Sequence, residues 1–136
     1  MSLPRRLPLR ATAALVLAAS LGLAGCVEAP KQPGLADVMD RPAERALLAG
    51  LRAYDDAQYT DAEQQLKRSL EAGLTSPRDR ATAHKMLAFI YCTSDRVAAC
   101  EQAFRAARQA DPAFALSKSE AGHPLWGPVY RRVTGS

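Results

Sequence analysis

Residues 81–112 have the sequence ATAHKMLAFIYCTSDRVAACEQAFRAARQADP, and this stretch decides the fold. Apolar side chains recur in it every three or four residues, which is the spacing of one face of an α-helix. The pattern is interrupted near Asp95 and ends at Asp111-Pro112, where proline prevents a helix from continuing. We therefore expect two helices joined by a short turn, one opening at Ser76-Pro77 and one at Asp95.

The preceding residues show the same periodicity. One helix is expected to begin after Asp40, a suitable N-cap residue, with Pro42 in its first turn. The next begins at Thr60, where Glu63 would complete a capping box, and it ends at Gly73. No stretch of alternating polar and apolar residues competes with these helices. The predicted fold class is all-α.

These four helices form an internal repeat with a constant offset of 38 positions. Small residues at fixed places and a closing proline, here Pro112, are features of the tetratricopeptide (TPR) repeat, which this spacing resembles. We therefore predict two TPR-like helical hairpins; the alternative is two amphipathic hairpins without TPR geometry. The matched pairs are Gly50 and Ala88, Tyr59 and Val97, Ala62 and Cys100, Leu66 and Phe104, and Ser69 and Ala107.

Residues 113–136 follow the second hairpin. Two repeats alone leave an end face uncovered, so this segment has to matter for stability. Phe114 and Leu116 begin a short expected helix that Gly122 stops, and the two prolines and the glycine of residues 123–130 argue against a regular helix there. The segment holds the only tryptophan, Trp126. It either caps the second hairpin, which we favour, or binds a partner.

The first 25 residues have the composition of a secretory signal peptide. Three arginines precede a short uncharged stretch, residues 11–21, which is shorter than the ~20 apolar residues of a membrane span. Leu23-Ala24-Gly25-Cys26 then resembles the lipobox of bacterial lipoproteins, so we expect cleavage after Gly25 and lipidation of Cys26. The alternative is an ordinary signal peptide with an incidental cysteine.

Residues 26–40 are expected to be a lipidated tether, because they contain Pro30, Pro33 and Gly34 and few large apolar side chains. Val27 stands where the enteric sorting rule requires Asp for retention at the inner membrane. The expected location is therefore the inner leaflet of the outer membrane, facing the periplasm. The predicted organisation is a signal (1–25), a tether (26–40) and a TPR-like domain with a C-terminal cap (41–136).

Three segments of the domain together resemble one family: Ala83–Cys92, the Phe104–Ala107 segment after Cys100, and EAGHPLWGPVY at Glu120–Tyr130. They resemble the TssQ family of TPR-like lipoproteins, which are associated with type VI secretion loci of proteobacteria. The similarity covers essentially the whole mature domain. It implies an accessory envelope component of the secretion apparatus, with the membrane complex of that apparatus as the expected partner.

Removal of the signal changes the charge of the chain. The signal holds three of the 18 lysines and arginines and none of the 14 acidic residues, so the 111 mature residues carry 15 basic against 14 acidic side chains. This balance gives no support for a nucleic-acid partner. Neither histidine, His84 or His123, has a nucleophile at a recognisable spacing, and no phosphate loop or metal-ligand spacing occurs. We expect no catalytic residue, cofactor, metal or small-molecule substrate.

The two remaining cysteines, Cys92 and Cys100, are expected to lie level with each other across the turn between their helices. Because the periplasm is oxidising, we predict a disulfide between them. The alternative is two small buried thiols in packing positions.

The predicted function is a lipid-anchored scaffold that binds other envelope proteins. The first helix of each TPR hairpin lines the concave face, and Tyr54 and Phe89 could instead be core residues. Alternative functions are a pilotin-like role, an adaptor for cell-wall hydrolases and, more remotely, a periplasmic enzyme. The candidate partner-binding residues are Glu44, Leu51, Tyr54, Lys85 and Phe89, with Trp126 and Tyr130 in the tail.

Overall fold

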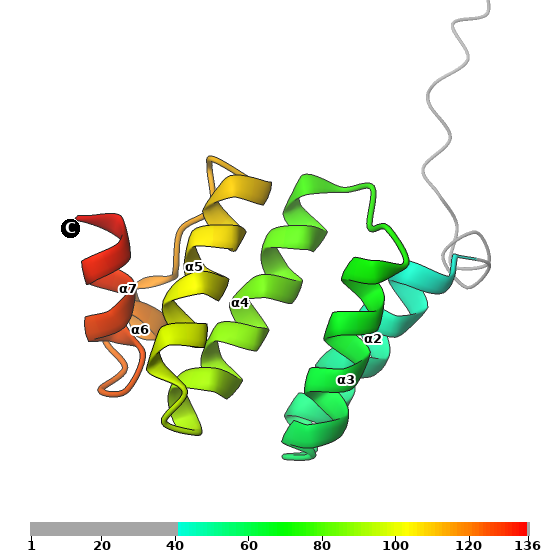
Figure 1. Ribbon diagram of the computed structural model, residues 1–136, viewed down its shortest axis with the longest axis horizontal. Helices are drawn as coiled ribbons and strands as arrows, with labels where there is room; N and C mark the ends of the chain where they lie inside the picture. The colour runs from blue at the N-terminus through cyan, green and yellow to red at the C-terminus, as the bar shows by residue number, and fades with distance from the viewer. Residues whose placement is uncertain (1–40, 136) are drawn as a thin grey trace, which may run out of the picture. The chain divides into compact units, whose positions relative to one another are not determined.

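The structure is a computed structural model that describes residues 41–135 (Figure 1). This range is helical and contains no strand, which confirms the predicted all-α class for the described residues. None of its helices is long and apolar enough to cross a membrane. The predicted signal and the predicted tether, with Cys26 and Asp40, lie outside the described residues. The helices are α2 (Pro42–Asp55), α3 (Tyr59–Glu71), α4 (Pro77–Thr93), α5 (Val97–Ala110), α6 (Lys118–Ala121) and α7 (Gly127–Thr134).

Neighbouring helices pack as two successive pairs. α2 packs along α3 to form the first pair, and α4 packs along α5 to form the second. α3 contacts α4, and α7 covers α5 (Figure 1). The core therefore runs through both pairs and ends under α7. Its most deeply buried side chains are Phe104, Leu66, Ile90, Cys100 and Ser69.

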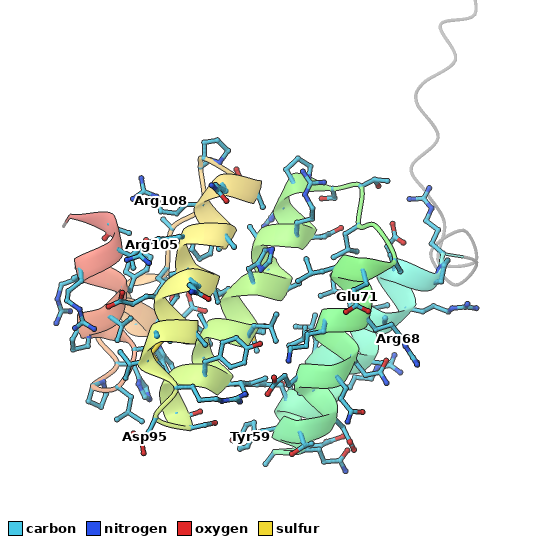
Figure 2. All side chains as sticks on the ribbon, viewed as in Figure 1. Tyr59, Arg68, Glu71, Asp95, Arg105 and Arg108 are labelled. Carbon is cyan, nitrogen blue, oxygen red and sulfur yellow. A yellow bond between two sulfur atoms is a disulfide. The ribbon has the colours of Figure 1, made fainter. Side chains whose placement is uncertain are left out.

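The turns within the two pairs have the same backbone geometry, 38 residues apart. Ala57 and Asp95 both adopt left-handed backbone, with φ of 60° and 57°. The N–H of Gln58 donates to the Ala53 carbonyl at 2.8 Å, and the N–H of Arg96 donates to the Tyr91 carbonyl at 2.9 Å. These bonds are those of a Schellman motif, which ends a helix tightly. Figure 2 shows Tyr59 and Asp95, one from each turn region, at the same end of the helices.

Burial follows the same offset. Ala62, Leu66 and Ser69 of α3 are fully buried, and so are their counterparts on α5. Tyr59 and Val97, which begin α3 and α5, are 48% and 45% exposed. The pairing predicted from sequence therefore holds position by position. The TPR geometry of these pairs stays a prediction.

The helix starts differ from the prediction in three places. The N-caps of α2, α3 and α5 are Arg41, Gln58 and Arg96, and none of them makes a side-chain capping bond. Thr60 and Asp95 therefore do not cap, because the Schellman turn already fixes where the next helix begins. The predicted cap of α4 is correct, since the Ser76 hydroxyl accepts from the N–H of Asp79 at 3.2 Å.

Glu63, expected to complete a capping box, instead links the two pairs. Its carboxylate accepts from both terminal nitrogens of Arg96, the shorter bond being 2.7 Å, and from Lys67 at 2.6 Å. The hydrogen bond from Arg96, together with the one from Lys67, outweighs burial and lowers the pKa of Glu63 to about 2. The Arg96 guanidinium also lies 4.5 Å from the centre of the Tyr91 ring. A charged cluster thus joins α3 to the turn of the second pair.

The C-terminal segment is more helical than predicted. α7 contains Pro128, which the prediction treated as a helix breaker, but this proline lies in the first turn, where no backbone N–H is needed. The expected helix from Phe114 is confined to the single turn of α6, which Ser117 and Glu120 cap reciprocally. Gly127 is required where α7 begins, because a Cβ there would collide with the Ala121 carbonyl.

The segment covers the end of the second pair. Val129 and Tyr130 of α7 are buried in the common core. The Tyr130 ring meets Phe104 edge-on with ring centres 5.3 Å apart, and the N–H of Leu116 donates to the Tyr130 hydroxyl at 3.2 Å. The C-terminal residues therefore pack onto α5 as a cap in this structure.

Candidate functional site

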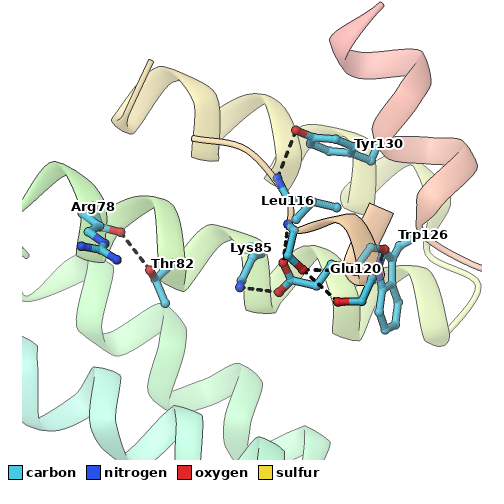
Figure 3. Close-up of polar contacts among 9 residues, drawn as sticks. Arg78, Thr82, Lys85, Leu116, Glu120, Trp126 and Tyr130 are labelled. Atoms are coloured by element: carbon cyan, nitrogen blue, oxygen red, sulfur yellow. Dashed lines mark hydrogen bonds and ion pairs between the residues drawn. The ribbon is translucent and has the colours of Figure 1, made fainter. Parts of the chain in front are cut away.

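Four of the predicted partner-binding residues are gathered where α4 meets the C-terminal segment. Lys85 of α4 pairs with Glu120 of α6 at 2.6 Å, and its ammonium lies 5.6 Å from the centre of the Phe89 ring (Figure 3). Trp126 stacks on Phe89 with ring centres 4.2 Å apart. Its indole N–H donates to the Glu120 carbonyl at 2.8 Å. Tyr130 is the fourth residue. Its hydroxyl accepts a hydrogen bond from the N–H of Leu116, in the segment that leads to α6.

Glu120 is the polar centre of this contact. Burial would raise the pKa of its carboxyl, but hydrogen bonds from Lys85 and from Ser117 outweigh that effect and hold the pKa below its usual range. Glu120 is therefore ionised at neutral pH and balances the charge of Lys85. Because of this pairing, Lys85 is not a free cation.

The exposure of these residues separates surface from core. Phe89 is 4% exposed and Tyr130 is 8% exposed, so their side chains offer almost no area to a partner. This agrees with the core alternative for Phe89. Trp126 is half-buried, and the His123 ring stacks on its indole with ring centres 3.3 Å apart. Lys85 is also half-buried and borders open surface.

The three other predicted partner-binding residues lie on α2. Glu44, in the first turn, pairs with Arg41 at 3.6 Å. Leu51 is half-buried, as is Tyr54, which meets Tyr59 edge-on at 5.4 Å. Burial raises the pKa of the Tyr54 phenol, and the nearby Tyr59, Asp55 and Glu120 raise it further.

A groove beside Lys85 was not identified from the sequence. It has a volume of about 370 Å³ and lies between the first half of α4 and residues 111–115. Arg78, Thr82 and Lys85 follow one another along its α4 wall (Figure 3). Their spacing of four and three residues places them on one helix face, and this signal could have found the wall. We call it the α4 groove; its lining is Arg78, Ala81, Thr82, Lys85, Asp111, Ala113, Phe114 and Ala115.

The predicted disulfide is present. Cys92 near the end of α4 and Cys100 in the first turn of α5 are bonded, with their Cα atoms 5.3 Å apart. That separation lies within the usual range for a disulfide. Both cysteines are buried, so the bond is a part of the core next to the turn of the second pair.

The two histidines lie in different settings. His84, on α4, is half-buried, and burial, followed by the charge of Arg80, lowers its pKa. His123 accepts a hydrogen bond from the N–H of Leu125 at 3.2 Å while stacking on Trp126. Within residues 41–135, no group of His, Cys, Asp and Glu side chains is arranged to hold a metal ion.

Comparisons of this chain with protein-family models, with curated proteins and with solved structures found no match. The resemblance to the TssQ family therefore rests on the sequence features given above.

Proposed function

We propose that this protein is a lipid-anchored periplasmic scaffold at the outer membrane. It binds other envelope proteins and serves as an accessory component of a type VI secretion envelope complex. It is not an enzyme in this proposal. The anchor is Cys26, acylated after removal of residues 1–25, and the tether of residues 26–40 carries the helical domain.

The observation that carries the proposal is the repeated backbone of the two helix pairs. The left-handed turn residues, the turn hydrogen bonds and the buried positions recur after 38 residues. Helical repeats that stack in this way expose one helix of each pair along a continuous face, which suits extended protein ligands. The half-buried Leu51 and Tyr54 on α2 and Lys85 on α4 supply this face with mixed apolar and charged chemistry.

The anchor is tested by fractionating cells that produce the chain. We expect the unchanged protein in the outer-membrane fraction, since two or more acyl chains hold a protein stably on a membrane. Cys26→Ser should move it to the soluble periplasmic fraction. Equal membrane recovery of both forms would contradict lipid anchoring.

The partner is tested by capturing the tagged protein from detergent-solubilised envelopes and identifying what it retains. We expect components of the type VI secretion membrane complex, and we expect Tyr54→Ala to reduce their recovery. Val97→Ala is the control, because Val97 is an apolar side chain that is 45% exposed and begins α5 rather than lying on α2. Circular dichroism of each variant checks that the fold is kept. Retention of no envelope protein by the unchanged chain would refute the scaffold function.

A further inference from the structure

The charged side chains of the four long helices are divided unevenly between the two ends of these helices. One end, which we call the entry end because the chain enters α2 there, comprises residues 41–48, 66–84 and 104–112 (Figure 1). The other, the turn end, comprises residues 49–65 and 85–103. The entry end has eight basic and four acidic side chains, whereas the turn end has three basic and six acidic ones. The helices therefore carry positive charge at one end and negative charge at the other.

Solvent exposure strengthens the positive charge at the surface of the entry end. Seven of its eight basic side chains are exposed, whereas Glu71 is the only exposed one of its four acids. Glu44 is half-buried and pairs with Arg41 at 3.6 Å. Asp79 and Asp111 are also half-buried. The exposed basic residues of the entry end are Arg41, Arg45, Lys67, Arg68, Arg78, Arg105 and Arg108.

Four of these arginines, Arg45, Arg68, Arg78 and Arg108, form no ion pair with any of residues 41–135. They line three separate hollows of the surface. Arg45 and Arg68 face one between α2 and α3, Arg78 lines the α4 groove, and Arg108 lines one beside the end of α5. The unpaired charge is therefore spread over the whole entry end and is not collected in one groove.

Helix stability accounts for only two of these four positions. Arg68 and Arg108 lie in the last turns of α3 and α5, where the helix dipole stabilises a cation. Arg45 and Arg78 lie near the beginnings of α2 and α4, where the same dipole disfavours a cation. The charges of Arg45 and Arg78 are therefore not explained by the helices that carry them.

We propose that the entry end lies against the anionic phospholipid surface of the membrane in which Cys26 is anchored. The chain from Cys26 reaches the domain at this end, and the 15 residues 26–40 span at most about 50 Å when fully extended. Such a tether keeps the domain at a high effective concentration near the headgroups. The guanidinium group of arginine matches the geometry of phosphate. This inference rests on the lipid anchor of the proposed function and adds the orientation of the scaffold.

A lipid surface fits the entry end better than a ligand held in one groove. Arg45 belongs to α2 and Arg108 to α5, and these two helices do not contact each other, so a short ligand in one groove would not reach both. A membrane presents anionic groups across the whole end at once. It also repels the turn end, so both ends favour the same orientation. The exposed acids of the turn end are Asp55, Asp56, Asp61 and Asp95.

The contact is tested by sedimenting the mature chain with Cys26→Ser together with vesicles, so that only side chains mediate binding. Vesicles of phosphatidylcholine alone are compared with vesicles that also contain phosphatidylglycerol. We expect binding to the second kind only, and we expect it to weaken as salt rises, since exposed charges are screened. Screening also means that the contact orients an anchored domain without retaining an unanchored one. Equal binding to both kinds of vesicle, or binding to neither at low salt, would overturn the proposal.

Single neutralised arginines give the decisive comparison. Arg45→Gln and Arg108→Gln should each weaken vesicle binding about fivefold, the effect of removing one basic residue from a membrane contact. Arg52→Gln is the matched control and should leave binding unchanged. Arg52 is, like Arg45, an exposed arginine of α2 without an ion pair, but it lies at the turn end.

Two patterns among these variants would contradict the proposal. A loss with Arg45→Gln and none with Arg108→Gln would assign binding to one groove. Equal losses in all three variants would mean that net charge alone attracts the chain, whatever its orientation. Circular dichroism of each variant checks that the fold is kept.

Two further outcomes separate this inference from the function on which it rests. If anionic vesicles do not bind the chain while Cys26→Ser still removes it from the outer-membrane fraction, the orientation proposal falls and the lipid anchor stands. If Arg45→Gln binds vesicles unchanged but no longer retains envelope proteins, the entry end binds an acidic protein. That result also overturns the proposal.

Discussion

The first pair, α2–α3, and the second pair, α4–α5, have the same turn geometry but different surroundings. Each first helix ends in a Schellman motif at a left-handed residue, Ala57 or Asp95. The second pair is flanked by α3 on one side and α7 on the other, whereas the described residues cover the first pair only on the side of α4. The second pair alone contains a disulfide. The same backbone geometry therefore occurs both at an end and in the middle of the described helices.

The side chains at matched positions reflect this difference. Leu66 in the first pair corresponds to Phe104 in the second, and Ala62 corresponds to the disulfide-bonded Cys100. Phe104 is larger than Leu66, and its ring contacts both Phe89 and Tyr130. We infer that the second pair holds most of the stability and that the first pair is the more easily opened end. Four predictions test this difference in stability between the two pairs.

The largest effect is expected from truncating the matched core positions. Phe104→Ala should destabilise the protein by about 3–5 kcal/mol, and Leu66→Ala by about 2–5 kcal/mol but less than Phe104→Ala in this chain. Both side chains are fully buried, yet only Phe104 also contacts the C-terminal cap. Urea unfolding measures both. A larger loss for Leu66→Ala would reverse the proposed order of the two pairs.

Loss of the disulfide should come next. The double variant Cys92→Ala, Cys100→Ala removes the cross-link that restricts the unfolded chain. Its free energy of unfolding is therefore expected to fall by about 2–3 kcal/mol. Hydrogen exchange should quicken in the turn between α4 and α5 and change little in the turn between α2 and α3. Equal quickening in both turns would mean that the two pairs open as one unit.

The charged link between the pairs should contribute less. Glu63→Gln is expected to cost about 1 kcal/mol at neutral pH, since its partner Arg96 is well exposed to solvent. The pKa of Glu63 is lowered in the folded protein from 4.5 to about 2, so the folded state binds the proton less tightly than the unfolded state. The contribution is therefore present above about pH 4.5 and is lost as the pH falls toward about 2.

Thermal melts of the unchanged protein and of Glu63→Gln across that pH range measure this link. The difference between the two melting temperatures should shrink on acidification. Glu71→Gln provides the control, because Glu71 is exposed and forms no ion pair within the described residues. A difference that stays constant down to pH 2, about the folded pKa, would show that the Glu63 charge does not join the pairs.

The smallest effect concerns the turn residues. Alanine is strained at φ of 60°, so Ala57→Gly should stabilise the protein by about 0.5 kcal/mol, after the entropy of glycine in the unfolded chain is subtracted. Asp95→Gly should gain less, because aspartate tolerates left-handed backbone better than alanine does. The melting temperatures of both variants and of the unchanged protein measure these changes in stability. A loss of stability in Ala57→Gly would mean that the turn is not left-handed in solution.

Much of the helical organisation could be predicted from the sequence. Periodicity located the four long helices, Ser76 marked the start of α4, and Gly73 marked the end of α3 with φ of 87°. The capping positions at Thr60 and Asp95 could not be predicted correctly, because a Schellman turn formed by Ala57 or Asp95 does not carry the usual glycine. α7 was missed because Pro128 breaks a helix at most positions and fits only in its first turn.

The candidate site was predictable only in part. The register on α2 and α4 selected Tyr54 and Lys85 as candidates, and both are half-buried. The burial of Phe89 and Tyr130 depends on where the tail folds. The α4 groove joins Arg78 to Phe114, which are separated by α5 in the chain. No local pattern signals that meeting.

By itself, the sequence determined the helices, the 38-residue repeat and the pairing of Cys92 with Cys100, because each depends on contacts between residues close along the chain. Tertiary structure alone decided that Glu63 bridges the pairs, that Trp126 stacks on Phe89 and that Lys85 is neutralised by Glu120. Those contacts join segments distant in sequence. The packing of whole helices decides which of these side chains meet, and local residue preferences do not depend on that packing.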